Sequence, residues 1–254
     1  MRFRSRRVLV TGGAGGIGAA TVAAFRAEGA RVALGTRNAA RFDAFVAAHG
    51  GADVVPALGD LASPEGCREA VAAAREALGG LDILVNAAGV YREAPACEVD
   101  DALWSETIAV NLSAPFLCIR AALPALRESG GSVVNVASDA GLIGQPLAAH
   151  YCAAKGGLVT MTKALALELA REVRVNAVCP SNVETPMIHA AAEASGDAAA
   201  YMRWAERYAP QGRMARPEEI AAAILWLASD EAAFVTGAAL PVDGARTAGV
   251  TLER

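Results

Sequence analysis

The stretch VLVTGGAGGIG, residues 8–18, decides the fold of this chain. Its β-branched beginning predicts a strand, and its glycines let the backbone turn sharply before a helix that begins near Gly16. A helix behind such a turn offers free amide groups and the positive end of its dipole to a phosphate. A turn that merely connects two elements is the alternative, and the strand before it and the helix after it argue against that.

The glycines in this turn match two spacings that are typical of dinucleotide-binding sites. Gly13, Gly15 and Gly18 follow G-x-G-x-x-G, whereas Gly12, Gly16 and Gly18 follow G-x-x-x-G-x-G. Only the second spacing has a threonine, Thr11, directly before its first glycine. The turn predicts contacts to a dinucleotide from Gly12, Gly15, Gly16, Ile17 and Gly18.

Further along the chain, short β-branched runs alternate with alanine-rich stretches of helical spacing, which is typical of a parallel sheet with helices on both faces. Seven strands are predicted, at 7–11, 30–35, 53–58, 81–87, 131–138, 173–178 and 238–243. Helices are predicted at 16–28, 39–49, 64–78, 101–127, 151–171 and 217–228. We therefore expect an α/β fold in which residues 1–254 form a single Rossmann-type domain around one doubly wound, parallel, seven-stranded sheet.

One segment departs from this alternation. Residues 181–213 are rich in alanine, serine and charge, and they show no clear strand. We expect the part at about 185–213 to form a lid over a substrate. A helical excursion that only packs against the body of the protein is the alternative interpretation.

Composition and charge narrow the range of partners. Hydrophobic residues make up 54% of the 254 residues and charged residues 20%, as in a folded globular protein. The net charge of −4 favours neither nucleic acid nor an anionic membrane, and the apolar runs are broken before the length of a membrane span. The start MRFRSRRVLV lacks a signal-peptide core, so we expect a cytoplasmic protein. Five widely spaced cysteines predict no metal site.

The end of the second predicted strand indicates which dinucleotide binds. An acidic residue there would accept hydrogen bonds from the ribose 2′-hydroxyl of NAD, but this chain has Thr36 and Arg37. The Arg37 guanidinium can pair with a 2′-phosphate, so NADP(H) is favoured. NAD(H) is a second option, because neutral Thr36 tolerates it and Arg37 is then a solvated loop charge.

Three polar side chains predict proton-transfer chemistry. Tyr151 and Lys155 lie four residues apart near the start of a predicted helix, so both emerge on one face. A nearby ammonium is expected to lower the pKa of the Tyr151 phenol, which then moves a proton. Without other evidence, a tyrosine and a lysine at this spacing more often lie on the exposed surface of a helix and have no catalytic role. Ser138 strengthens the case, because it ends a strand at the carboxyl edge of the sheet, where it can hold a carbonyl oxygen.

Two other places in the sequence support a ligand at the same edge. NAAG, residues 86–89, closes the fourth strand with small residues that let backbone approach a flat ring or a ribose. Asn111 lies within an otherwise apolar helix, where its amide needs partners if it is buried. An ordinary turn and a satisfied core amide are the alternative interpretations.

From Val8 onward, the chain resembles the short-chain dehydrogenase/reductase family in its common, non-extended form. TGGAGGIG resembles the cofactor motif of that family, NAAG its fourth-strand motif and FVTGAALPVDG its closing segment. The resemblance implies a catalytic tetrad of Asn111, Ser138, Tyr151 and Lys155. The expected cofactor contacts beyond the glycine turn are Thr36, Arg37, Asp60, Leu61, Asn86, Ala87, Gly89, Tyr151, Lys155, Pro180, Val183 and Thr185.

The resemblance also assigns roles to some of these residues. It implies that Lys155 binds the nicotinamide ribose and that Asn111 holds a water in a proton relay. Two positions depart from the family pattern. Ser181 replaces the usual glycine after Pro180, and Gly15 stands where many NADP-preferring relatives have a basic residue, which weakens the expectation of NADP.

The expected function is that of an NAD(P)-dependent oxidoreductase, with Tyr151 as the acid or base and a small-molecule secondary alcohol or carbonyl as substrate. A 3-oxoacyl-thioester (acyl carrier protein) reductase is the specific alternative. A basic patch for such a carrier could come from Arg203, Arg207, Arg213 and Arg216, although balancing nearby acids is their more ordinary role. A non-catalytic dinucleotide-binding regulator is the alternative from another class, and the complete tetrad argues against it.

Location in the sequence suggests which residues face the substrate. They are Ala140, Leu142, Ile143, Gln145, His150, Met187, Ile188 and Trp204. By resemblance, the helices at 101–127 and 151–171 pair across two-fold axes and give a homotetramer or a homodimer.

Overall fold

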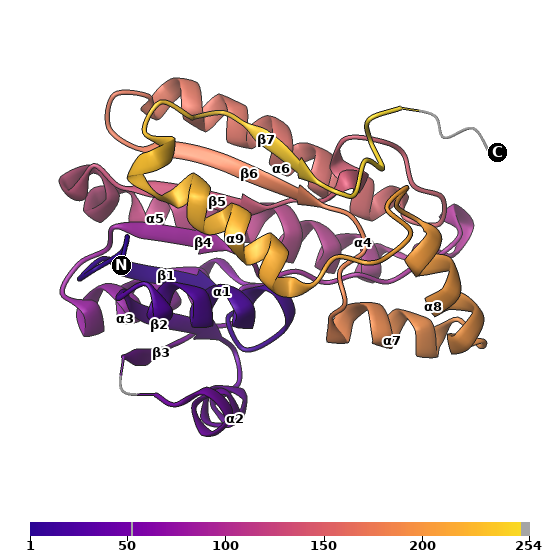
Figure 1. Cartoon of the computed structure of the whole chain (residues 1–254), viewed down its shortest axis with the longest axis horizontal. Coiled ribbons are helices and arrows are strands. Elements are labelled where there is room, and N and C mark those ends of the chain that lie inside the picture. Colours follow the sequence, from indigo (N-terminus) through magenta and orange to yellow (C-terminus); the bar gives the residue numbers. More distant parts are fainter. Residues whose placement is uncertain (52, 250–254) are drawn as a thin grey trace.

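The computed structural model describes residues 1–51 and 53–249. Its centre is a parallel sheet in the order β3-β2-β1-β4-β5-β6-β7 (Figure 1). The strands are β1 (Arg7–Thr11), β2 (Arg31–Thr36), β3 (Val54–Leu58), β4 (Ile83–Asn86), β5 (Ser132–Val136), β6 (Arg174–Pro180) and β7 (Ala239–Val242). The prediction of a doubly wound, parallel, seven-stranded sheet is confirmed.

Helices cover both faces of the sheet because successive strand residues point to opposite sides. Val10 of β1 packs in the core under α1 (Gly16–Ala27), α2 (Ala39–His49) and α9 (Pro217–Ala228). Its neighbour Leu9 packs in the other core, under α3 (Pro64–Leu78), α5 (Ala114–Ser129) and α6 (Ala149–Leu169). Figure 1 shows α1 and α9 side by side in front of the sheet.

Two predicted helices have different bounds in the structure. The helix expected at 101–127 consists of α4 (Asp101–Ile108), a π-helical turn at Ala109–Ser113 and α5. The helix expected from residue 151 begins at Ala149, so Tyr151 lies in its first turn. Sequence periodicity does not distinguish a π turn from an α turn, since both continue an apolar helix.

The helical run Asp101–Ser129 is long and apolar enough to cross a membrane by length and composition. Its apolar residues have another explanation, because Cys118, Ile119 and Leu126 pack in the core with Leu9 and Leu84 of the sheet. The run is therefore accounted for as a core helix.

The segment without a predicted strand forms two helices, α7 (Pro186–Ala194) and α8 (Ala198–Arg207). They lie beyond the carboxyl ends of the strands (Figure 1). Two backbone hydrogen bonds close the base of this segment, from Glu184 N to Ala215 O over 2.9 Å and from Ala215 N to Asn182 O over 3.0 Å. The segment therefore leaves the sheet domain and returns to it at one place, as expected for a lid that is attached at its base.

Candidate active site

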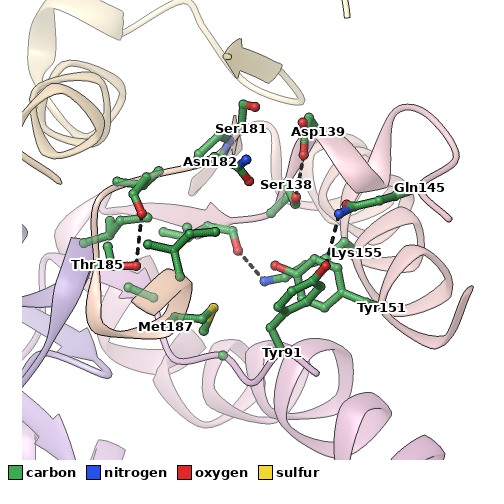
Figure 2. Close-up of a pocket in the computed structure, with 18 residues that line it drawn as sticks. Tyr91, Ser138, Asp139, Gln145, Tyr151, Lys155, Ser181, Asn182, Thr185 and Met187 are labelled. Carbon is green, nitrogen blue, oxygen red and sulfur yellow. Dashed lines mark hydrogen bonds between the residues drawn. The ribbon is translucent and has the colours of Figure 1, made fainter. Parts of the chain in front are cut away.

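A pocket opens at the carboxyl edge of the sheet, where β4, β5 and β6 end beside α1, α6 and α7 (Figure 2). Ligands of parallel α/β sheets bind at this edge. Predicted site residues that line the pocket are Ile17, Ala87, Gly89, Ser138, Tyr151, Lys155, Pro180, Val183 and Thr185. The other lining residues are Tyr91, Val136, Ala137, Asp139, Gln145, Ser181, Asn182, Met187 and Ile188.

The glycine turn after β1 has no room for side chains at its inner positions. A Cβ on Gly18 would lie 2.2 Å from the carbonyl oxygen of Gly12, and one on Gly12 would lie 2.7 Å from the Cα of Ala88. Gly12 and Gly16 also adopt positive φ angles of 66° and 50°. Gly15 is the N-cap of α1, and a Cβ there would meet none of the described residues within 4 Å. Helix amides that face open space fit the pyrophosphate of a dinucleotide.

The end of β2 presents the residues predicted to select the dinucleotide. The Thr36 hydroxyl accepts a hydrogen bond from Asn38 N over 3.2 Å, and Asn38 in turn caps α2 by accepting from Ala40 N over 2.9 Å. Arg37 between them is exposed and forms no ion pair with the described residues. Its guanidinium is therefore available to a phosphate.

Asp60 and Leu61 follow β3, next to the end of β2. Gly59 N donates to Thr36 O over 3.2 Å, which brings the two strand ends together. The exposed Asp60 carboxylate accepts from Ala62 N over 3.1 Å, while Leu61 packs partly against the core. Neither residue lines the pocket, so any contact to a dinucleotide lies at its far end, near Arg37.

The end of β4 is fixed to β1 by a side chain of the glycine motif. Thr11 Oγ1 accepts from Ala87 N over 3.1 Å and from Ala88 N over 3.3 Å. Asn86 is buried and donates its amide to Asn135 Oδ1 over 2.9 Å. Its Nδ2 is thus used in the core, while its buried Oδ1 accepts no hydrogen bond from a described residue.

Asn111 lies in the π turn and is fully buried. Its Nδ2 donates to Val90 O over 3.0 Å and to Thr107 O over 3.1 Å, and its Oδ1 accepts from Val90 N over 3.2 Å. Both amide protons are therefore used, and one lone pair of Oδ1 is left for another group. The residue ties the loop after β4 to the long helix, while its predicted place in a proton relay remains a prediction.

Ser138 follows β5 and points into the pocket, as predicted. Its hydroxyl donates to Asp139 Oδ1 over 3.0 Å, and Ala140 N donates to the same carboxylate oxygen over 2.8 Å. Asp139 is only 4% exposed. This carboxylate was not predicted, although it follows the expected serine at the same strand end.

Tyr151 and Lys155 face the pocket together from α6. The Lys155 Nζ lies 5.6 Å from the centre of the Tyr151 ring and donates to the carbonyl oxygen of Val136 over 2.8 Å. This bond anchors Lys155 to β5, the strand that also delivers Ser138. The structure thus brings Ser138, Tyr151 and Lys155 to one site (Figure 2).

The pKa values at this site differ from the expectation. Burial raises the pKa of Tyr151, a hydrogen bond with Ser138 opposes that rise, and the negative charge of Asp139 adds to it. Burial also lowers the pKa of the Lys155 ammonium to about 8. The expected lowering of the Tyr151 pKa is therefore wrong, because burial dominates this pKa and the group that opposes burial is the Ser138 hydroxyl rather than the Lys155 ammonium.

The chain after β6 covers the glycine turn. A Cβ on Gly16 would lie 3.0 Å from Cγ2 of Thr185, so the Thr185 side chain sits directly over the start of α1. The Thr185 hydroxyl donates to Val183 O over 3.2 Å, and Pro180 ends β6 at the pocket wall. These three predicted cofactor contacts therefore lie along one wall, between the glycine turn and Ser138.

A polar network at the pocket mouth was not predicted. Glu93 Oε1 accepts hydrogen bonds from the hydroxyls of Tyr91 over 2.8 Å and Tyr201 over 2.7 Å, while Gln145 Nε2 donates to the Tyr91 hydroxyl over 3.1 Å. The Tyr91 ring packs edge-on against Tyr151, with 4.9 Å between centroids. Its position two residues after NAAG, just past a strand end, is the signal that could have revealed Tyr91.

The predicted substrate-facing residues divide into two groups. Gln145, Met187 and Ile188 line the pocket, whereas Ala140, Leu142, Ile143, His150 and Trp204 do not. His150 is buried, with Nε2 3.0 Å from the carbonyl oxygen of Arg92. Trp204 packs between the rings of Tyr201 and Tyr208. Proximity in sequence did not reveal which way these side chains point.

Comparison with known proteins identifies the family. The family model described as "Enoyl-(Acyl carrier protein) reductase" matches residues 12–247. The chain is 41% identical to D-threitol dehydrogenase of Mycolicibacterium smegmatis, over 97% of this chain and 94% of that protein. It is 37% identical to 3-oxoacyl-(acyl-carrier-protein) reductase of Thermotoga maritima, over 96% of this chain and 98% of that protein.

A solved structure agrees with these matches. It is the short-chain dehydrogenase/reductase "Glucose/ribitol dehydrogenase" of Brucella melitensis, which superposes with a TM-score of 0.87 at 39% identity and covers 96% of this chain and 97% of that one. The chain therefore belongs to the short-chain dehydrogenase/reductase family, whose members are nicotinamide-dependent enzymes acting on alcohols or carbonyls.

Proposed function

We propose that this enzyme transfers a hydride between NADP(H) and a small secondary alcohol or ketone, with Tyr151 as the proton donor or acceptor. The observation that carries the proposal is the convergence of Ser138, Tyr151 and Lys155 on one pocket that reaches the glycine turn through Ile17. A substrate carbon in this pocket would lie between the hydroxyls of Ser138 and Tyr151, which bind its oxygen, and the dinucleotide at the glycine turn.

The residues present fit a nicotinamide dinucleotide. The side-chain-free turn at Gly12 and Gly18 accepts the pyrophosphate, and Pro180, Val183 and Thr185 form the wall expected beside the nicotinamide. Lys155, anchored to Val136, is expected to hold the nicotinamide ribose. When bound, the dinucleotide supplies or accepts the hydride, and the positive charge of its oxidised ring favours the Tyr151 phenolate.

The protein groups handle the substrate oxygen and its proton. In reduction, the Tyr151 hydroxyl donates a hydrogen bond to the carbonyl oxygen, and the Ser138 hydroxyl turns its one proton from Asp139 to the same oxygen, so both stabilise its developing negative charge. Burial keeps Tyr151 protonated in this state, so it has a proton to give. In oxidation the proton moves in the opposite direction.

Arg37 supports the choice of NADP(H). Its guanidinium is exposed at the end of β2 and makes no ion pair with the described residues, which suits a 2′-phosphate. A direct test is to titrate the protein with NADPH and with NADH, before and after Arg37→Ala. We expect tighter binding of NADPH, lost in the variant. Tighter binding of NADH than of NADPH, with no change in the Arg37→Ala variant, would refute this preference.

The substrate class has two candidates. Two of the relatives are named for threitol and for glucose or ribitol, which supports a polyol. The Thermotoga relative supports a 3-oxoacyl thioester instead. Of the arginines that could bind an acidic carrier, Arg213 and Arg216 already pair with Glu219, over 2.8 and 3.6 Å. We therefore favour a small alcohol or ketone over a carrier-bound thioester.

We also propose that the chain forms one domain, works in the cytoplasm and assembles as a homotetramer or homodimer. An outward apolar side chain on each of two long helices supports assembly: Phe116 of α5 is 40% exposed and Leu167 of α6 is 84% exposed. Sedimentation analysis of the purified protein tests this assembly, and a monomer at micromolar concentration would refute it.

The function itself is tested by steady-state assays. The purified enzyme is supplied with NADPH or NADH and a panel of small ketones and hydroxyketones, or with acetoacetyl thioesters, and nucleotide oxidation is followed. We expect turnover of the small ketones. Exclusive turnover of the thioester would favour the acyl-carrier alternative, and nucleotide binding without any turnover would favour the regulator.

A further inference from the structure

Two buried polar atoms in the pocket have no well-aligned protein partner. Asp139 Oδ2 and Ser181 Oγ are both buried, and neither forms a well-aligned hydrogen bond with a described residue, although the Ser181 hydroxyl lies close enough to Asp139 to lower the pKa of its carboxyl. Both residues line the pocket beside Ser138. A buried polar atom without a partner costs free energy, so a pair of them in a binding pocket indicates a ligand group that satisfies both.

We propose that Asp139 and Ser181 form a subsite that binds a second hydroxyl group of the substrate, close to the reacting carbon. This inference rests on the proposed function and deepens it, because it assigns the substrate to the vicinal or near-vicinal diols and hydroxyketones.

The chemistry of the two atoms selects a hydroxyl. A carboxylate oxygen only accepts hydrogen bonds, whereas a serine hydroxyl both donates and accepts. An alcohol can donate to Asp139 Oδ2 and accept from Ser181 Oγ at the same time. A second ketone, a thioester or a carboxylate offers Asp139 no proton, and a carboxylate would be repelled by it.

The geometry sets the separation between the two substrate oxygens. Ser138, which is expected to hold the reacting oxygen, donates to Asp139 Oδ1 over 3.0 Å. The free Oδ2 belongs to the same carboxylate, so the subsite begins directly beside the reacting oxygen. Figure 2 shows Asp139 and Ser181 on one side of Ser138, with Tyr151 and Lys155 on the other. A hydroxyl on the adjacent carbon, or on the next one, reaches this side.

The carboxylate is held in place before a substrate arrives. Besides Ser138, Ala140 N donates to Asp139 Oδ1 over 2.8 Å, so one oxygen is fixed by two donors while the other, Oδ2, has no well-aligned donor among the described residues. Burial raises the pKa of the Asp139 carboxyl, while hydrogen bonds from Ser138, Ala140 N and Ser181 and the positive charge of Arg246 oppose that rise. Ser181 stands where the family usually has glycine, so its hydroxyl is a feature of this chain rather than of the general fold.

The test compares matched ketones with and without the second oxygen. kcat/KM is measured for 3-hydroxy-2-butanone, 2-butanone and 3-methoxy-2-butanone, and for 2-hydroxycyclohexanone against cyclohexanone. In the wild type, the hydroxyketone is expected to exceed the plain ketone by about tenfold or more, as for a hydrogen bond to a charged group. The methoxy ketone lacks the proton and is expected to gain nothing.

Variants identify the residues responsible. Asp139→Asn replaces the acceptor with an amide donor, so we expect the hydroxyketone-to-ketone ratio to fall by about tenfold, mainly through KM. Ser181→Gly is expected to lower the same ratio severalfold. Gln145→Leu is the matched control, since Gln145 is a polar residue on the opposite side of the pocket, beside Tyr91. Melting curves and nucleotide titration verify that each variant folds.

The outcomes are separable. An unchanged ratio in Asp139→Asn, or a collapse of the ratio in Gln145→Leu instead, would overturn the subsite while leaving the proposed function intact. A wild type that reduces butanone and the hydroxyketone equally well would also overturn it. Failure to reduce any ketone with either nucleotide would overturn the proposed function, and the subsite with it.

Discussion

The Tyr201 hydroxyl donates to Glu93 Oε1 over 2.7 Å and thereby joins helix α8 to the loop after β4. The same oxygen accepts from Tyr91, whose ring contacts Tyr151. Burial and the Glu93 carboxylate raise the pKa of both Tyr91 and Tyr201, so both stay protonated and able to donate at neutral pH. One carboxylate thus links the proposed lid to the ring that packs on the proposed catalytic tyrosine.

Removing this link should loosen the lid. In Tyr201→Phe the hydrogen bond to Glu93 is lost while the ring still packs on Trp204, so we expect KM for the carbonyl substrate to rise about three- to tenfold. Nucleotide affinity should stay within about twofold, because α8 lies away from the glycine turn. Tyr208→Phe removes a hydroxyl from the same segment without touching Glu93 and serves as the control. Equal effects of both variants would contradict the tether.

Lys155 gives a stability prediction with a defined pH window. Its pKa is lowered from 10.5 to about 8, so between these values the unfolded chain binds more protons than the folded one, and stability rises with pH. Below pH 8 the full cost of burying the charge applies. Relative to Lys155→Met, the wild type should therefore gain stability from pH 8 to pH 10.5, by up to about 3 kcal/mol. Urea unfolding of both proteins at several pH values measures this, and a constant difference would contradict it.

The glycine turn predicts opposite outcomes for two similar substitutions. Gly18→Ala forces a Cβ to within 2.2 Å of a backbone oxygen, so the turn must move. We expect a loss of stability of about 2 kcal/mol or more, together with loss of nucleotide binding. Gly15→Ala meets none of the described residues and keeps an extended backbone with φ of −162°, so its folding stability should change by less than about 1 kcal/mol. Thermal melting distinguishes the two, and similar melting temperatures would refute the packing argument.

Local patterns predicted the parts of the site that lie at strand ends. Ser138 and the glycine turn were found because strand periodicity fixes where a strand stops, and the carboxyl edge is where ligands bind. Lys155 was found because a spacing of four residues fixes a common helix face. Each of these inferences depends only on residues close together in the sequence.

The remaining features depend on contacts between distant residues, which one sequence does not reveal. Glu93 meets Tyr201 across more than a hundred positions of the chain. The pKa of Tyr151 follows from how deeply α6 packs, and the commitment of Asn86 to the core follows from its partner Asn135. His150 was expected in the pocket but turns to Arg92, because helix phase at the first turn of α6 depends on where that helix starts.

The central claim is that Tyr151 moves the proton in a nicotinamide-dependent reaction. The most direct test is the turnover of Tyr151→Phe with the best ketone and nucleotide, measured beside the nucleotide dissociation constant of the same preparation. We predict that kcat falls by about 10²–10⁴-fold or more while nucleotide affinity stays within a few-fold. A variant that keeps kcat within tenfold of the wild type would contradict the account, because another group would then have to supply the proton.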